Sequence, residues 1–182
     1  MSAAPAAQEA ASPAKSPTLA VAFLGVLAGI QLIDPAVANI AIVEASQSLG
    51  MTGSVVALAA SISTLALAAT VLPMGMMADR LGRRKILGAA LIIAIIGDVI
   101  VALSPITAGY LAGRALAGIG VGATLAAAFA YVRFVARPGK VASALGLWNL
   151  VMVGFFIVGS LVGGQLAGIN WRIAMLLVPA IA

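Results

Sequence analysis

Long, almost uninterrupted apolar stretches constrain this chain more than any other feature. Five of them are close to, or longer than, the roughly 20 residues that cross a bilayer core as a helix. They are predicted to span residues 18–43, 54–77, 86–103, 107–132 and 141–166. Because a backbone in lipid must satisfy its own hydrogen bonds, spans of this kind form α-helices. The chain is therefore predicted to be an all-α membrane protein.

The composition agrees with a lipid environment and excludes several functions. Hydrophobic residues make up 63% of the chain and charged residues only 8%, against about 45–50% and 25% in an ordinary soluble domain. The net charge of +5 lies in short clusters between apolar runs, which argues against nucleic-acid binding. Without Cys or His, the chain lacks thiolate and imidazole metal sites, Cys nucleophiles and His general bases. We predict no metal, no cofactor and no enzymatic activity.

The two ends of the chain differ from its middle. Residues 1–17 are rich in Ala, Pro and Ser and are predicted to be a disordered cytoplasmic tail, which leaves residues 18–182 as the transmembrane domain. A sixth apolar stretch, residues 173–182, holds only about half the residues of a full span. We therefore expect a six-helix bundle truncated within its sixth helix.

Basic residues gather in alternate connections between the predicted helices. Four cations lie within residues 80–85 and three within residues 133–140, whereas the opposite connections offer only Arg172 against Glu44. Cytoplasmic connections of membrane proteins carry an excess of Lys and Arg. We therefore predict a multi-pass protein of the cell membrane, inner or plasma, with its N-terminus and both basic connections in the cytoplasm.

Small and polar residues recur within the predicted helices. Glycines stand four apart at several places, among them Gly118 and Gly122, and Gly159 and Gly163. Such spacing lets helix backbones approach closely, either for static packing or for a surface that slides during a conformational change. Polar residues such as Gln31 are expected to hydrogen-bond across helices or to line a cavity.

The connection between the second and third predicted helices has a distinctive order of residues. Residues 75–85 read Gly-Met-Met-Ala-Asp-Arg-Leu-Gly-Arg-Arg-Lys. Gly82 can adopt the positive φ of a tight reversal, and Asp79 can accept hydrogen bonds from neighbouring guanidinium groups. On charge alone, the turn could be an orientation anchor that interacts with anionic lipid. The order G-x-x-x-D-R-x-G-R-R at this position resembles the signature loop of the major facilitator superfamily.

This resemblance implies a fold and a role for the turn. The chain would form the N-terminal six-helix bundle of a major facilitator fold, and the turn would be a conformational gate. Asp79 and Arg83 would face a helix of the C-terminal half, which is missing from this chain. Gly75 would permit the close helix contact, while Arg80 and Arg84 would support the charge network. The implied gating residues are Gly75, Asp79, Arg80, Gly82, Arg83 and Arg84.

Two further stretches resemble the fourteen-helix drug:proton antiporter branch of that family. Residues 33–42 are similar to the pattern L-D-x-T-x-V-N-V-A-L-P, with Ala36 and Val43 in place of the usual Thr and Pro. Residues 159–164, Gly-Ser-Leu-Val-Gly-Gly, are close to the pattern G-P-x-x-G-G, with Ser160 in place of Pro. The resemblance assigns Gly159, Gly163 and Gly164 to a helix-packing motif.

Three ionisable residues lie inside predicted membrane spans, and each needs a reason to be there. They are Asp34, Asp98 and Arg114; glycines follow Arg114 in a pattern similar to the fourth-helix motif of the family. A charge at the bilayer centre costs at least about 2.5–3.5 kcal/mol. At 1.5 Å per residue from the predicted helix ends, all three fall roughly 8–12 Å below the outer surface.

These positions suggest proton coupling. Arg114 can neutralise one carboxylate and leave the other without a cation, and a membrane acid that exchanges a proton is what coupling needs. We predict Asp34 as the acid linked to proton and substrate, Arg114 as its partner, and Asp98 as the second candidate. The alternative is a static buried ion pair that orients the helices.

The expected function follows from these features. No G-x-x-x-x-G-K-[ST] stretch occurs in the sequence, so the energy would come from an ion gradient. The resemblance implies secondary transport by alternating access, with proton-coupled efflux of small amphipathic compounds favoured over proton-coupled metabolite uptake. The expected partners are a small-molecule substrate, protons, the bilayer and the missing C-terminal half. A different possibility is a truncated product that transports nothing, or a helper subunit that binds other membrane helices.

Overall fold

The computed structural model describes residues 17–182, and all of its regular structure is helical. The predicted tail, residues 1–17, lies outside the described residues except for Pro17, which opens the first helix. The five long helices are α1 (Pro17–Ser48), α2 (Ser54–Leu81), α3 (Arg83–Leu103), α4 (Thr107–Val135) and α5 (Val141–Ala167). Each is long and apolar enough to cross a membrane. The predicted all-α membrane fold is confirmed.

The helix ends differ from the predicted ranges. Each of the five predicted ranges lies inside one helix, but α1 continues past Val43 into the polar residues 44–48, and α3 begins three residues earlier than predicted. Helices are not limited to the apolar core, because their backbones remain hydrogen-bonded in water as well as in lipid.

The structure divides the segment predicted as one partial span, residues 173–182. The chain forms two short helices there, α6 (Trp171–Met175) and α7 (Leu177–Ile181). The first begins early because Asn170 caps it, its side chain accepting a hydrogen bond of 2.9 Å from the Arg172 amide. It ends at Met175 because Pro179 has no N–H to donate to the Met175 carbonyl, and its ring crowds that carbonyl.

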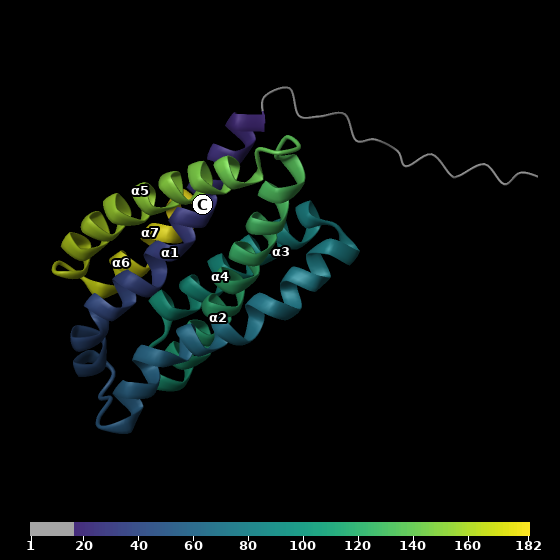
Figure 1. Ribbon diagram of the computed structural model, residues 1–182. Helices are drawn as coiled ribbons and strands as arrows, with labels where there is room; N and C mark the ends of the chain where they lie inside the picture. The colour runs from purple at the N-terminus through teal and green to yellow at the C-terminus, as the bar shows by residue number, and fades with distance from the viewer. Residues whose placement is uncertain (1–16) are drawn as a thin grey trace, which may run out of the picture.

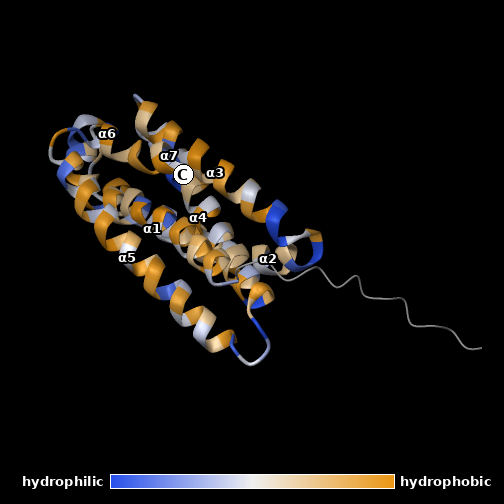
Figure 2. Cartoon of the chain, turned by 90° about the horizontal axis from the view of Figure 1, so that it is seen from above, coloured by the Kyte–Doolittle hydropathy of each residue, from blue (hydrophilic) through white to orange (hydrophobic). Residues whose placement is uncertain are grey.

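The long helices form two groups that meet at α1 and α4 (Figure 1). In one group α4 packs against both α2 and α3, and in the other α1 packs against α5. Contacts between α1 and α4 join the groups, and these are the two most buried helices. By contrast, α2 and α5 leave apolar side chains such as Leu72 and Leu150 more than 70% exposed. Figure 2 shows apolar residues along the helices and hydrophilic residues gathered in the connections.

Glycines allow α4 to approach both of its neighbours closely. A Cβ atom on Gly113 would lie 2.8 Å from the Gly97 carbonyl oxygen of α3, and one on Gly122 would lie 2.7 Å from the Leu67 carbonyl oxygen of α2. Gly118 contacts the α2 backbone at Ser63 in the same way. No larger residue fits at these positions without moving a helix.

The glycines of the predicted packing motif lie mostly against α1. At Gly159 and Gly163, a Cβ atom would overlap the side chains of Ile33 and Val37. Gly164 has more room, since its nearest neighbour would be the Cδ1 atom of Ile40 at 3.4 Å. The first two glycines therefore leave room for side chains of α1. The close approach to the α5 backbone lies at Gly25 and Gly29 of α1, where a Cβ atom would come within 2.8 and 2.6 Å of the Trp148 and Met152 carbonyl oxygens.

Substituting Gly113→Ala should lower the free energy of unfolding by about 1–3 kcal/mol, because the added methyl group overpacks the contact between α3 and α4. Gly154→Ala is the matched control, since nothing lies within 4 Å of a Cβ atom there; it should leave stability unchanged or slightly higher. Unfolding in mixed detergent and dodecyl sulfate, followed by circular dichroism, measures both. Equal stabilities for the two variants would contradict the packing described here.

Candidate functional site

Three buried ionisable side chains meet where α1, α3 and α4 converge. Asp34, Asp98 and Arg114 are only 3%, 1% and 2% exposed. The Nη1 atom of Arg114 donates a hydrogen bond to Oδ1 of Asp34, forming a buried salt bridge between α4 and α1. The structure therefore brings together the three residues that the sequence singled out within the membrane spans.

Asp98 adds a second acid to this pair. Its carboxyl group lies close enough to Asp34 and Arg114 to interact with both, but neither of its oxygens has a hydrogen-bond partner among residues 17–182. Oδ2 of Asp34 and Nε of Arg114 are also unpartnered among them. Buried polar atoms are nearly always paired, so this cluster has spare capacity for a proton, a water molecule or a polar group of a ligand.

The depth predicted for Asp34 rests on a helix end that the structure corrects. Counting back from Val43 placed this residue near the outer surface, but α1 runs on to Ser48. Asp34 therefore lies further from the end of its helix than Asp98 and Arg114 lie from the ends of theirs. The three residues lie at the same depth in the bundle, as the contact between Arg114 and Asp34 shows. Their distances in residues from the helix ends are unequal and do not explain this common depth.

Helix α1 lacks one backbone hydrogen bond beside the cluster, which the sequence analysis did not predict. Pro35 lies inside the helix and has no N–H, so the Gln31 carbonyl loses its helical donor. The Gln31 side chain is fully buried, and neither of its amide atoms has a partner in the described part of the chain. The expected cross-helix hydrogen bond of Gln31 is therefore absent there. An Asp-Pro step within an apolar run was the available signal.

Arg172, the second residue of α6, ties this short helix to the end of α3. Its Nη1 atom donates hydrogen bonds of 2.7 Å to the carbonyl oxygens of both Ala102 and Ser104. A cation at a helix C-terminus stabilises the unpaired carbonyl groups of the last turn. This contact positions the end of the helix that carries Asp98.

Two aromatic residues lie between the cluster and the same end of the bundle. Tyr110 is one helical turn before Arg114 on α4 and is 1% exposed. The Trp171 ring meets the Tyr110 ring edge-on, with 5.9 Å between the ring centroids. The first residue of α6 thus covers the turn of α4 that leads to Arg114.

The predicted charged turn joins α2 to α3 at the opposite end of the bundle. Gly82 has a φ of 102°, which permits the reversal between the two helices. Arg83 forms an ion pair of 2.7 Å with Asp79, one turn earlier in sequence. The Asp79 side chain is 58% exposed, so the pair contributes little stability, about 0.2–1 kcal/mol.

Two aromatic residues of α4 hold this turn, and the sequence analysis missed them. Arg84 Nε donates a hydrogen bond of 2.7 Å to the Tyr131 hydroxyl. The Arg83 guanidinium lies over the Phe134 ring, 4.8 Å from its centroid. In the sequence, only the spacing of Tyr131 and Phe134, three residues apart in the last turns of an apolar helix, indicated that these two rings could contact the turn.

Arg80 and Gly75 make no ion pair and no tight backbone contact with the described helices. Arg80 is exposed and forms no salt bridge with the described residues. At Gly75, a Cβ atom would come no nearer than 3.9 Å to Ala126. The close helix contact predicted at Gly75 therefore has no partner among residues 17–182.

Together these features define a multi-pass helical membrane protein with an ion cluster between its central helices. Residues 19–182 match the family described as the Major Facilitator Superfamily. The chain is 30% identical to the inner membrane transport protein YnfM of Escherichia coli K12 over 71% of its length. It is 31% identical to the methyl viologen resistance protein SmvA of Salmonella typhimurium over 74%, and 29% identical to the puromycin resistance protein pur8 of Streptomyces alboniger over 78%.

The chain belongs to the Major Facilitator Superfamily, as the charged turn indicated. Members of this family are membrane transporters and not enzymes. The matches cover 31% of YnfM, 27% of SmvA and 28% of pur8, so the chain spans less than a third of the length of each relative.

The buried ion pair predicts a specific pattern of stabilities. Arg114→Met should lower the free energy of unfolding by about 3–5 kcal/mol, because breaking a buried pair leaves a charge without its partner. Combining it with Asp34→Asn should cost less than the sum of the single changes, by about 0.5–3 kcal/mol. Glu44→Gln is the control, a carboxyl-to-amide change at an exposed position of α1, and it should change stability little. Additive costs for Asp34 and Arg114 in this double-mutant cycle would contradict a coupled pair.

Proposed function

We propose that this chain forms the N-terminal helical half of a secondary transporter that exports small amphipathic compounds in exchange for protons. The observation that carries the proposal is the buried cluster of two carboxyl groups and one guanidinium between α1, α3 and α4. Ionisable residues at this depth are costly in a membrane and usually mark ion or substrate pathways.

The cluster offers a physical route for coupling. While Asp34 is ionised, it holds Arg114 in the salt bridge. A proton that binds to Asp34 removes the negative charge that attracts the Arg114 guanidinium. Asp98 lies close enough to become the new partner of that guanidinium. The pair is thus an element with two arrangements, which proton binding at Asp34 selects. Because the pair links α1 to α4, this exchange would be felt by both central helices.

Efflux is the direction best supported. The relatives include proteins named for resistance to puromycin and to methyl viologen, which are small organic cations or amphiphiles. The substrate would bind near the bilayer midplane, between this half and a second half. Proton-coupled uptake of a metabolite is the alternative with the same machinery, run in the opposite direction.

The charged turn would be the gate of this transporter. More than half of the Asp79 side chain is exposed, which leaves it free to meet a helix of the second half. Gly75 is only partly buried, and without a side chain it would let that helix approach the α2 backbone closely. In the conformation described here Asp79 pairs with Arg83. A residue of the second half that binds either of them would compete with this ion pair and stabilise a different conformation of the turn.

A second candidate is a membrane fragment or helper subunit that transports nothing alone. The uncovered apolar faces of α2 and α5, which other membrane helices could cover, favour it. Reading the genomic DNA downstream of Ala182 separates the two. An open frame with about six further spans supports the transporter, and an immediate stop supports the fragment.

The proposed orientation places the N-terminus and both basic connections in the cytoplasm of the inner or plasma membrane. Since the chain contains no Cys, single cysteines report sidedness without background. Thr52→Cys, between α1 and α2, should react with a membrane-impermeant maleimide in intact cells. Lys85→Cys, in the basic turn, should react only after the cells are permeabilised. The reverse pattern would overturn the orientation.

Replacing Asp34 with Asn in the complete transporter should abolish proton-driven transport. Methyl viologen is the probe, and its uptake into inside-out vesicles under an imposed pH gradient is the measurement. The rate should fall to that of empty vesicles, because an amide cannot exchange a proton. Exchange of labelled for unlabelled methyl viologen without a gradient should persist, which shows that the variant is folded.

Glu44→Gln is the matched control, a carboxyl-to-amide change at an exposed position of the same helix. It should leave gradient-driven uptake unchanged. Unchanged uptake in Asp34→Asn as well would rule out Asp34 as the coupling acid. Gradient-driven movement in the opposite direction would replace efflux with metabolite uptake as the function of this chain.

A further inference from the structure

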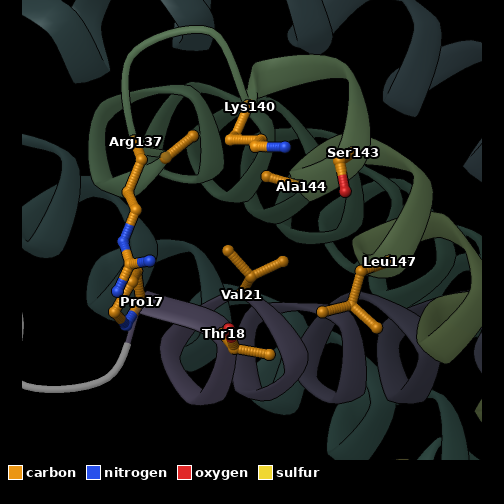
Figure 3. Close-up of a pocket in the computed structure, with 9 residues that line it drawn as sticks. Pro17, Thr18, Val21, Arg137, Lys140, Ser143, Ala144 and Leu147 are labelled. Atoms are coloured by element: carbon orange, nitrogen blue, oxygen red, sulfur yellow. The ribbon is translucent and has the colours of Figure 1, made fainter.

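A small cavity lies at the end of the bundle that carries the two basic connections. Its volume is about 310 Å³, at the lower end of the range of about 300–1,000 Å³ found for small-molecule sites. It opens between the first turn of α1, the α4–α5 connection and the first turns of α5 (Figure 3). It is remote from the acid cluster, which lies deep between α1, α3 and α4.

The rim of this cavity is cationic and rich in hydrogen-bond donors. Arg137 and Lys140 approach it from the α4–α5 connection, and Thr18 and Ser143 add hydroxyl groups from α1 and α5. Figure 3 shows the Arg137 side chain reaching across the opening toward Pro17. None of the nine lining residues is acidic, and neither cation forms a salt bridge with a described residue.

The floor of the cavity is apolar. Val21 and Leu147 line it about one helical turn beyond Thr18 and Ser143, and Ala144 lies beside Ser143. Val21 is 2% exposed. The lining of the cavity therefore changes from polar to apolar along the helix axes. Its polar rim lies at the helix ends, at the level of lipid headgroups, and its apolar floor lies toward the bilayer core.

We propose that this cavity binds a phosphate group. Two cations without an acidic residue among the described lining residues, together with two hydroxyl donors, match the charge and the acceptor oxygens of a phosphate. The Arg guanidinium can donate two parallel hydrogen bonds to it. The phosphate can belong to an anionic phospholipid or be free in solution. The apolar floor favours the lipid, whose glycerol and first acyl carbons would cover Val21 and Leu147.

Such a ligand would connect two parts of the bundle that are separate in sequence. The phosphate would connect the start of α1, through Thr18, to the α4–α5 connection and α5, through Arg137 and Ser143. Basic pockets between membrane helices are recognised sites for anionic lipid headgroups. This site is separate from the proposed transport mechanism and stands whether or not Asp34 couples protons.

The test measures ligand binding to the 182-residue chain and needs no transport. The chain is reconstituted in nanodiscs of phosphatidylcholine with a quarter phosphatidylglycerol, and the lipid it retains is counted by native mass spectrometry. Neutralising both cations, Arg137→Gln with Lys140→Gln, should lower the retained phosphatidylglycerol by at least about tenfold. A decrease of this size is expected because the variant loses one or more charge-assisted hydrogen bonds to the phosphate.

Two matched variants keep the result interpretable. Lys85→Gln with Arg133→Gln removes the same charge from the same end of the bundle, at exposed residues that do not line the cavity; it should retain the lipid. Arg137→Lys with Lys140→Arg keeps both charges and should also retain it. Circular dichroism measures the melting temperature of each variant, so that a loss of lipid caused by unfolding is distinguished from a loss of lipid binding.

A second set of measurements identifies the source of the phosphate. Inorganic phosphate is titrated into the same chain in pure phosphatidylcholine nanodiscs. Binding that disappears in the Arg137→Gln, Lys140→Gln variant and persists in the control supports the site with free phosphate as its ligand. Retention of phosphatidylglycerol with the same dependence supports the lipid. If the cavity variant and the control bind both probes equally, the proposal is overturned.

Discussion

The salt bridge between Arg114 and Asp34 is the interaction on which the rest of the structure depends. In lipid an isolated guanidinium is among the most costly groups a helix can carry, so α4 must present Arg114 to an acid. The acid is on α1, and the contact therefore joins the α1–α5 pair to the group formed by α2, α3 and α4. The second acid, Asp98, lies close enough to interact with both members of the pair, and the proposed mechanism uses it as the alternative partner of Arg114.

Close helix packing is what brings these charges together. Gly97 and Gly113, which directly precede Asp98 and Arg114, allow α3 and α4 to approach with backbone contacts. Lipid provides no hydrophobic drive between helices, so shape and interhelical polar contacts must hold the bundle. The charged turn at one end and the Arg172 contacts at the other, to the Ala102 and Ser104 carbonyls, fix α3 at both of its ends.

Much of this arrangement could be predicted from the sequence, because the bilayer imposes length and hydropathy on every span. The five helices, the charged turn and the three buried ionisable residues followed from local patterns. What local patterns could not predict depends on distant contacts. The support of Arg83 and Arg84 by Phe134 and Tyr131 requires knowing that α3 and α4 are neighbours. The division between α6 and α7 follows from Pro179, whose effect on the Met175 carbonyl is visible only once the helix start is known.

The central claim is that Asp34 exchanges its proton when the transporter binds its substrate. The most direct measurement is proton release into weakly buffered detergent solution, followed with a pH-indicator dye, when methyl viologen is added to the complete transporter. Our account predicts release by the wild type and by the exposed control Glu44→Gln, and none by Asp34→Asn at saturating substrate. Release by Asp34→Asn equal to that of the wild type would contradict it.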